Sequence, residues 1–136
     1  MVSKQNKAVK KRKTILIVDD DSILLRMYTQ KFTAEGYEVL NAINGEEAYE
    51  VFKKGKIDMI ICDLMLPKVS GVEFIEKLRN IPAGKEVPVI VWSNLQDEET
   101  NNKIKKLGIT KTLAKYAVSL DKIVEIVSEA LLAKAK

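Results

Sequence analysis

The sequence predicts a three-layer α/β fold, in which a five-stranded parallel sheet is covered by helices on both faces. Short apolar, β-branched runs alternate with amphipathic segments along the whole chain. The runs are apolar at consecutive positions, which is typical of strands buried on both faces. Most of them stop abruptly at a charged or hydroxyl side chain. Regular alternation of strands and helices implies right-handed crossovers, so five parallel strands with five helices follow.

The composition fits one globular domain and excludes several classes of protein. The chain has 136 residues, of which 46% are hydrophobic and 31% are charged. No apolar run approaches the roughly 20 residues of a membrane span, and the polar start does not resemble a signal peptide. A single cysteine excludes an internal disulfide, and the lack of histidine excludes Ser-His-Asp and Cys-His hydrolases. We therefore expect a cytoplasmic protein with no membrane partner.

The basic charge is concentrated at the N-terminus. Residues 1–13 carry six basic side chains and no acid, whereas residues 14–136 have a slight excess of acids. We expect residues 1–13 to form a disordered, solvated tail and residues 14–136 to form the folded domain. The tail lacks aromatic side chains that would stack on bases, so any nucleic-acid binding would rest on its charge alone.

The first half of the chain predicts two strands, each followed by a helix. Residues 14–18 read TILIV and predict the first strand. Apolar residues recur at helical spacing over residues 22–35, and Gly36 supplies a helix stop. Residues 37–42 predict a second strand. Asn44, with an acid three residues later, is a helix N-cap pattern, and the helix should end near Lys54.

The second half repeats the pattern three times. Apolar runs predict strands at residues 57–62, 87–92 and 109–114. Ser70 and Glu73 form a capping box that opens the third helix. The helix predicted at residues 96–107 has a thin apolar face, so we expect it to pack loosely. Ser119 is the expected cap of the last helix.

Polar side chains follow four of the five predicted strands. Asp19 and Asp20 follow the first strand, Asp63 the third, Ser93 the fourth and Lys115 the fifth. Because the carboxyl ends of parallel strands meet at one edge of the sheet, these side chains should lie together. Clustered carboxylates need a cation, and hard oxygen ligands favour Mg²⁺. Such a pocket suits phosphoryl transfer, with a carboxylate as nucleophile and an ammonium to neutralise phosphoryl oxygens.

Neighbouring residues compete for some of these roles. Asp19 and Asp20 could merely cap the first helix, where anions suit the helix dipole. Asp21 fits that capping role better than a metal-binding one. Lys111 is the rival of Lys115, but it falls inside the predicted strand rather than at its end.

Four segments together resemble the receiver domains of response regulators in two-component signalling, of the stand-alone, chemotaxis-regulator-like kind. They are ILIVDDD at residues 15–21, DLMLPKVSG at residues 63–71, Val91-Trp92-Ser93, and Ala114-Lys115. The resemblance covers residue 14 to about residue 132. It implies the flavodoxin-like fold with strand order 2-1-3-4-5.

The resemblance also implies a role for each residue of the pocket. Asp63 would accept a phosphoryl group from a histidine kinase or a phosphotransfer protein. Mg²⁺ would be held by Asp19, Asp20, Asp63 and the backbone carbonyl of Met65. Ser93 would be the switch hydroxyl, and Lys115 would pair with the phosphoryl group. Such a protein is not an enzyme beyond catalysing its own phosphorylation and dephosphorylation.

The expected output is a change of affinity for another protein. We expect the partner surface on residues 96–107, 109–114 and 119–132, with a shift of the loosely packed helix on phosphorylation. Three residues depart from the family pattern: Asn94 replaces a small residue, Thr112 an aromatic residue and Tyr116 a proline. These changes put signal propagation in doubt. One hypothesis is that Tyr116 takes over from the missing aromatic residue.

Two other functions stay open. Asp19-x-Asp21 after an apolar strand also fits the nucleophile motif of haloacid-dehalogenase-like phosphatases. That family needs a larger chain and an acidic pair late in the sequence, which is missing after Lys115. The other function is a receiver whose basic tail, residues 1–13, binds nucleic acid.

Overall fold

The computed structural model describes residues 12–94 and 97–135. The predicted tail lies outside this part of the chain, apart from Arg12 and Lys13, which are exposed. Gln96, the predicted first residue of the fourth helix, also lies outside the described residues. No helix in the described ranges is long and apolar enough to cross a bilayer.

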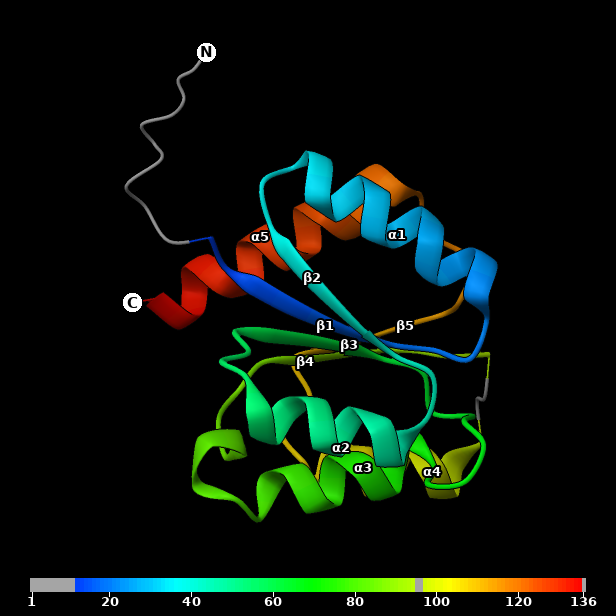
Figure 1. The fold of residues 1–136 in the computed structure, drawn as a ribbon. Coiled ribbons are helices and arrows are strands. Elements are labelled where there is room, and N and C mark those ends of the chain that lie inside the picture. The colour runs from blue at the N-terminus through cyan, green and yellow to red at the C-terminus, as the bar shows by residue number, and fades with distance from the viewer. Residues whose placement is uncertain (1–11, 95–96, 136) are drawn as a thin grey trace.

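Strands and helices alternate along the chain, and one short 3₁₀ helix, η1, is inserted between α3 and β4 (Figure 1). The strands are β1 Thr14–Val18, β2 Glu38–Ala42, β3 Met59–Cys62, β4 Val89–Trp92 and β5 Lys111–Leu113. The helices are α1 Ser22–Ala34, α2 Gly45–Lys54, α3 Gly71–Arg79, η1 Pro82–Gly84, α4 Glu98–Lys105 and α5 Leu120–Ala135.

The strands form one parallel sheet in the order β2-β1-β3-β4-β5. This confirms the strand order implied by the resemblance. Val18, the last residue of β1, pairs with Ala42 and Cys62, so the first three strands end level with one another. Trp92, the last residue of β4, pairs with Leu113 at the end of β5. The residues that follow β1, β3, β4 and β5 therefore gather at one edge of the sheet.

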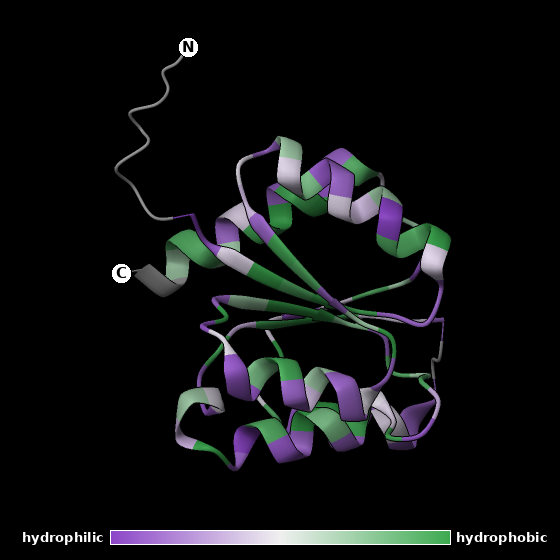
Figure 2. Ribbon diagram, viewed as in Figure 1, coloured by the Kyte–Doolittle hydropathy of each residue, from purple (hydrophilic) through white to green (hydrophobic). Residues whose placement is uncertain are grey.

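Helices cover both faces of the sheet. In Figure 1, α1 and α5 lie on one side, and α2, α3 and α4 lie on the other. Alternate strand residues point to opposite faces, so Ile17 and Ile61 pack towards the α1 and α5 side, while Leu16 packs on the other. Figure 2 shows the resulting apolar interior. Full burial of such side chains contributes about 1.5 to 3 kcal/mol each, which explains why the strands are apolar throughout.

Four strands are shorter than the sequence predicts. β2 begins at Glu38 rather than residue 37. β3 begins at Met59 rather than residue 57, since the Asp58 carboxylate instead accepts a hydrogen bond from the Thr14 N–H at 2.8 Å. β4 begins at Val89, directly after Pro88, which has no N–H to donate. β5 extends only over Lys111–Leu113. β2, β3 and β4 are shortened only at their amino ends, and β5 is shortened at both ends. The residues that follow the strands therefore still meet at the carboxyl edge of the sheet.

The predicted helix caps are confirmed. Asp21 caps α1 and accepts hydrogen bonds from Ile23 N and Leu24 N at 3.0 and 3.1 Å. Asn44 caps α2, and Ser70 with Glu73 forms the predicted capping box of α3. α4 has the predicted thin apolar face, because Ile104 is its one buried residue.

Arg79, at the end of α3, connects three segments of the chain. Its guanidinium group donates four hydrogen bonds of 2.7 to 3.1 Å to the backbone carbonyls of Gly84, Val87, Leu107 and Gly108. These carbonyls belong to η1, the approach to β4 and the turn after α4. Burial lowers the pKa of Arg79, but a guanidinium remains charged at any physiological pH. The carboxyl end of α4 is thus fastened to α3 by one side chain.

Candidate functional site

Three carboxylates lie together at the carboxyl edge of the sheet. Oxygen atoms of Asp19, Asp20 and Asp63 are all within 4.8 Å of one another. Asp19 is fully buried and Asp63 is 4% exposed, whereas Asp20 is exposed. The first two residues after β1 and the first after β3 supply this cluster, as predicted from the strand ends.

The position of Asp63 is set by the close approach of its own loop to α3. Gly71 N–H donates to the Leu64 carbonyl at 3.1 Å, and a Cβ atom at Gly71 would collide with the carbonyl oxygen of Asp63. One carboxylate oxygen of Asp63 accepts a hydrogen bond from Met65 N at 3.1 Å. The glycine eight residues after the acid is therefore a steric requirement of the site.

Lys115 supplies the positive charge. Its ammonium nitrogen lies 2.8 Å from Oδ2 of Asp19 and 2.8 Å from Oδ2 of Asp63. Burial disfavours the ammonium form, but the two carboxylates outweigh this effect and raise the pKa of Lys115. Burial also raises the pKa of Asp19, against the lowering effect of Lys115. Lys111, the rival residue, is the first residue of β5 and lies at the opposite end of that strand.

The donor set fits a hard divalent cation. Asp19 Oδ2 is fully buried, and its partner among the described residues is the Lys115 ammonium, 2.8 Å away, which it shares with Asp63. One ammonium does not balance three carboxylates, two of which are buried. A Mg²⁺ ion with oxygen ligands would relieve this excess of clustered negative charge.

Ser93 and Trp92 bring the end of β4 to the same pocket. Ser93 is 2% exposed, and its N–H donates to the Leu113 carbonyl at 3.0 Å. Trp92 is buried, as predicted, and its ring lies 4.5 Å from the ring of Tyr28 on α1. The Trp92 indole N–H is buried with no hydrogen-bond partner in the described ranges. An indole ring one residue from Ser93 is placed to report changes in this strand end.

The departures from the family pattern lie on different sides of the pocket. Asn94 is exposed, directly after Ser93. Thr112 is exposed on β5 and pairs with Val91 of β4. Tyr116, in contrast, extends towards α1, where its hydroxyl donates to Asp21 Oδ2 at 3.3 Å. The hypothesis that Tyr116 takes over from the missing aromatic residue stays a prediction.

Sequence reasoning missed two features near the site. Tyr28 is buried beneath Tyr116 in a shared hollow, and burial raises the pKa of its hydroxyl. Its helical spacing marks it as a core residue and carries no further signal. Asp21 was assigned to capping alone, yet its N–H also donates to Asp19 Oδ1 at 2.9 Å. That second contact depends on the turn after β1 and has no sequence signature.

Cys62 takes no part in this pocket. It is fully buried next to Asp63, and its thiol donates to the Asp63 carbonyl oxygen at 3.1 Å. Burial raises its pKa well above the usual thiol range. A buried neutral thiol is a poor nucleophile, which agrees with its interpretation as a strand residue.

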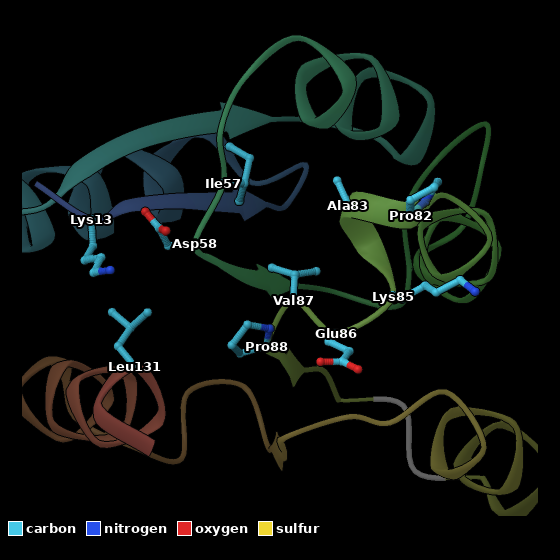
Figure 3. Close-up of a pocket in the computed structure, with 10 residues that line it drawn as sticks. All are labelled: Lys13, Ile57, Asp58, Pro82, Ala83, Lys85, Glu86, Val87, Pro88 and Leu131. Carbon is cyan, nitrogen blue, oxygen red and sulfur yellow. The ribbon is translucent and has the colours of Figure 1, made fainter. Parts of the chain in front are cut away.

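A further hollow lies at the other end of the molecule. It has a volume of about 410 Å³ and lies at the amino edge of the sheet, between η1, the approach to β4 and the end of α5 (Figure 3). Lys13, Asp58, Lys85 and Glu86 bring mixed charges to its wall. None of the residues predicted for the site lines it.

Comparison with known proteins agrees with this geometry. The family described as "Response regulator receiver domain" matches residues 15–128. The "Polar-differentiation response regulator DivK" of Brucella anthropi is 26% identical over 119 residues, covering 88% of this chain and 96% of DivK. A "Probable transcriptional regulator ycf27" from Cyanidium caldarium is 36% identical over 93 residues, covering 68% of this chain. The chain spans about a third of the length of that and similar curated relatives.

Solved structures give the same result. A CheY-like response regulator receiver domain protein from Methanospirillum hungatei superimposes with a TM-score of 0.86 and 26% identity, covering 92% of this chain and 98% of that one. The chemotaxis response regulator CheY4 of Vibrio cholerae gives a TM-score of 0.80 and 26% identity, covering 88% and 98% of the two chains.

Proposed function

This chain belongs to the response regulator receiver domain family, and on that basis we propose that it accepts a phosphoryl group on Asp63. The observation that carries the proposal is the position of this carboxylate. Asp63 lies within reach of two further acids and 2.8 Å from the Lys115 ammonium. The carboxylate that would attack phosphorus therefore lies beside the Lys115 ammonium and beside two acids that could bind Mg²⁺. Both kinds of group are needed for phosphoryl transfer.

The donor would be a phosphohistidine of a histidine kinase or a phosphotransfer protein. An Asp63 carboxylate oxygen attacks phosphorus, the P–N bond breaks, and its electron pair returns to the imidazole of the donor. The product is an acyl phosphate on Asp63. Asp19, Asp20, Asp63 and the Met65 carbonyl would hold Mg²⁺, and the ion would supply charge neutralisation for the phosphoryl oxygens.

Lys115 and Ser93 have separate roles in this proposal. Lys115 exchanges its contact with Asp63 Oδ2 for one with a phosphoryl oxygen, which keeps an ammonium beside the new charge. Ser93 donates its hydroxyl to a second phosphoryl oxygen and draws the end of β4 towards it. Hydrolysis of the acyl phosphate by water returns Asp63 to its starting state. We infer no catalysis on other substrates.

The output would be a change in affinity for a partner protein. The proposed face comprises residues 96–107, 109–114 and 119–132, and two features support it. Ile104 is the one buried residue of α4, and β5 exposes Lys111 and Thr112. A helix held by one buried side chain shifts at little cost when the neighbouring strand end moves. In this role the protein would act in the cytoplasm.

The alternative of a haloacid-dehalogenase-like phosphatase is not favoured by the site. That motif needs Asp19 and Asp21 as a working pair, but Asp21 caps α1 and lies outside the carboxylate cluster. Nucleic-acid binding by residues 1–13 stays a prediction, since residues 1–11 lie outside the described part of the chain.

Intact mass spectrometry after incubation with acetyl phosphate and Mg²⁺ tests the proposal. We expect one added phosphoryl group on the wild type and none on Asp63→Asn. Asp58→Asn is the matched control, because Asp58 is an acid at the amino edge of the sheet and contacts Thr14 N. A phosphoryl group on Asp63→Asn, or none on the wild type once Mg²⁺ binding is confirmed, would contradict the proposal. Steady turnover of a generic phosphate ester would favour the phosphatase.

A further inference from the structure

We propose that Tyr116 is a positioning residue, which ties the loop carrying Lys115 to the first turn of α1 and so holds the Lys115 ammonium over Asp63. This inference rests on the proposed function, because it concerns the efficiency of phosphorylation at Asp63. It goes beyond the family pattern, in which a proline stands at this position.

The backbone of Tyr116 is the first observation. Tyr116 has φ of +66°, in the left-handed region that side chains other than glycine and asparagine seldom adopt. Such a conformation in an aromatic residue persists only where surrounding contacts hold it. The turn around it is closed by a hydrogen bond from Ala117 N to the Ala114 carbonyl at 3.2 Å.

The contacts of the side chain supply the reason. The Tyr116 hydroxyl donates to Asp21 Oδ2 at 3.3 Å, and its ring centroid lies 5.9 Å from Lys115 Nζ. Ile23, Met27 and Leu120 line with it a hollow of about 280 Å³ between α1 and α5. Tyr116 is nevertheless 67% exposed, so burial of apolar surface alone does not explain why its ring lies there.

The contacts form a chain that returns to the acid cluster. Tyr116 binds Asp21, the Asp21 N–H binds Asp19 Oδ1 at 2.9 Å, and Asp19 Oδ2 lies 2.8 Å from Lys115. Lys115 is therefore held from two sides: by its own ion pairs and by the residue that follows it. Because β5 ends at Leu113 and α5 begins at Leu120, Lys115 stands on a loop with no strand pairing of its own.

The expected consequence is specific to the step that uses Lys115. A loop released from α1 samples conformations in which the ammonium does not face Asp63, so the phosphorylation rate falls. Affinity for Mg²⁺ depends on the three carboxylates and stays close to that of the wild type. A general loss of structure would reduce both, so the two readouts separate positioning from folding.

Three variants test the idea. Tyr116→Phe removes the hydroxyl bond alone, Tyr116→Ala removes the ring, and Tyr116→Gly also relieves the left-handed backbone. Tyr37→Phe is the control, because its hydroxyl contacts Ser128 Oγ at 2.9 Å, after the end of α1 and away from the acid cluster. The measurements are the rate of phosphorylation by acetyl phosphate at saturating Mg²⁺, the Mg²⁺ dissociation constant by calorimetry, and hydrogen exchange at the Ala117 amide.

We expect the rate to fall about two- to tenfold in Tyr116→Phe, the range that one modest hydrogen bond produces, and at least as far in Tyr116→Ala and Tyr116→Gly. Tyr37→Phe should match the wild type. The Mg²⁺ dissociation constant should change by less than about twofold, and Ala117 exchange should accelerate in the glycine variant.

Several results would overturn the proposal. A Tyr116→Gly variant with the rate and Ala117 exchange of the wild type would leave Tyr116 without a positioning role. A parallel loss of Mg²⁺ affinity would indicate collapse of the acid cluster instead. If the wild type is not phosphorylated at all, the proposed function fails. Hydrogen exchange at the Ala117 amide of the Tyr116 variants would then still show whether the Tyr116 side chain holds the loop.

Discussion

Replacing Asp20 by asparagine is expected to stabilise the protein in the absence of divalent metal and to weaken its response to Mg²⁺. Oxygen atoms of Asp19, Asp20 and Asp63 lie within 4.8 Å of one another. Asp20 is the exposed member, so its loss leaves no buried polar atom without a partner. It is therefore the substitution that removes repulsion at the least structural cost.

The magnitude follows from the separation of the charges. Two unit charges about 5 Å apart repel by about 1 kcal/mol in water and about 3 kcal/mol at an effective dielectric of 20. Asp20 is exposed to solvent, so the lower figure applies to its repulsion from Asp19 and to its repulsion from Asp63. Attraction between Asp20 and Lys115 offsets about half of this summed repulsion. The net gain is about 1 kcal/mol, or about 3 to 5 °C in Tm for a chain of this size.

In saturating Mg²⁺ the wild type should be more stable than Asp20→Asn. At a hundred times its dissociation constant, a ligand that binds only the folded state stabilises it by about 2.7 kcal/mol. Asp20→Asn lacks one carboxylate ligand, so it should gain less than the wild type. Urea unfolding with EDTA and with Mg²⁺ measures both effects. Glu46→Gln, which removes an exposed acid from the first turn of α2, is the control and should be neutral or slightly destabilised.

Two results would refute this reasoning. If Asp20→Asn is no more stable than the wild type in EDTA, repulsion within the cluster is negligible. If Mg²⁺ stabilises both proteins equally, Asp20 is not a ligand.

Three further predictions concern neighbours of the cluster. Lys115→Met should destabilise the protein by about 2 kcal/mol or more in EDTA, because two buried carboxylates lose their cation; an unchanged urea midpoint would contradict this. Gly71→Ala should cost about 1 to 3 kcal/mol, since the new methyl group collides with the Asp63 carbonyl, and its phosphorylation rate should fall with its stability. The Cys62 thiol should react with a disulfide reagent only after unfolding, because burial raises its pKa; rapid labelling of the native protein would show that β3 opens.

Much of the site could be predicted because it depends on strand order and strand ends. Asp63 and Lys115 are 52 residues apart in the chain, yet Asp63 directly follows β3 and Lys115 is the second residue after β5. Once the strands are recognised, geometry brings their following residues together. The capping role of Asp21 was also predictable, since a cap needs only contacts within four residues.

The features that could not be predicted depend on contacts between segments that are distant in the chain. Arg79 reaches carbonyls as far as 29 residues away, and a helical arginine carries no mark of such partners. The left-handed backbone of Tyr116 has no sequence signal, because tyrosine itself does not favour it. The late start of β4 had a local signal in Pro82, Gly84 and Pro88, which interrupt the apolar pattern before residue 89.

The four carbonyls that converge on Arg79 define a pivot. Since two of them belong to the turn directly after α4, we expect a displacement of this helix to be mainly a rotation about that turn. Eight residues at about 1.5 Å each give a lever arm of about 12 Å, so a rotation of 10° moves the first turn by about 2 Å. The far end of the lever lies towards Ser93. In the proposed switch, a small movement of the strand end would become a swing of Glu98 and Glu99 about a fixed turn at Gly108.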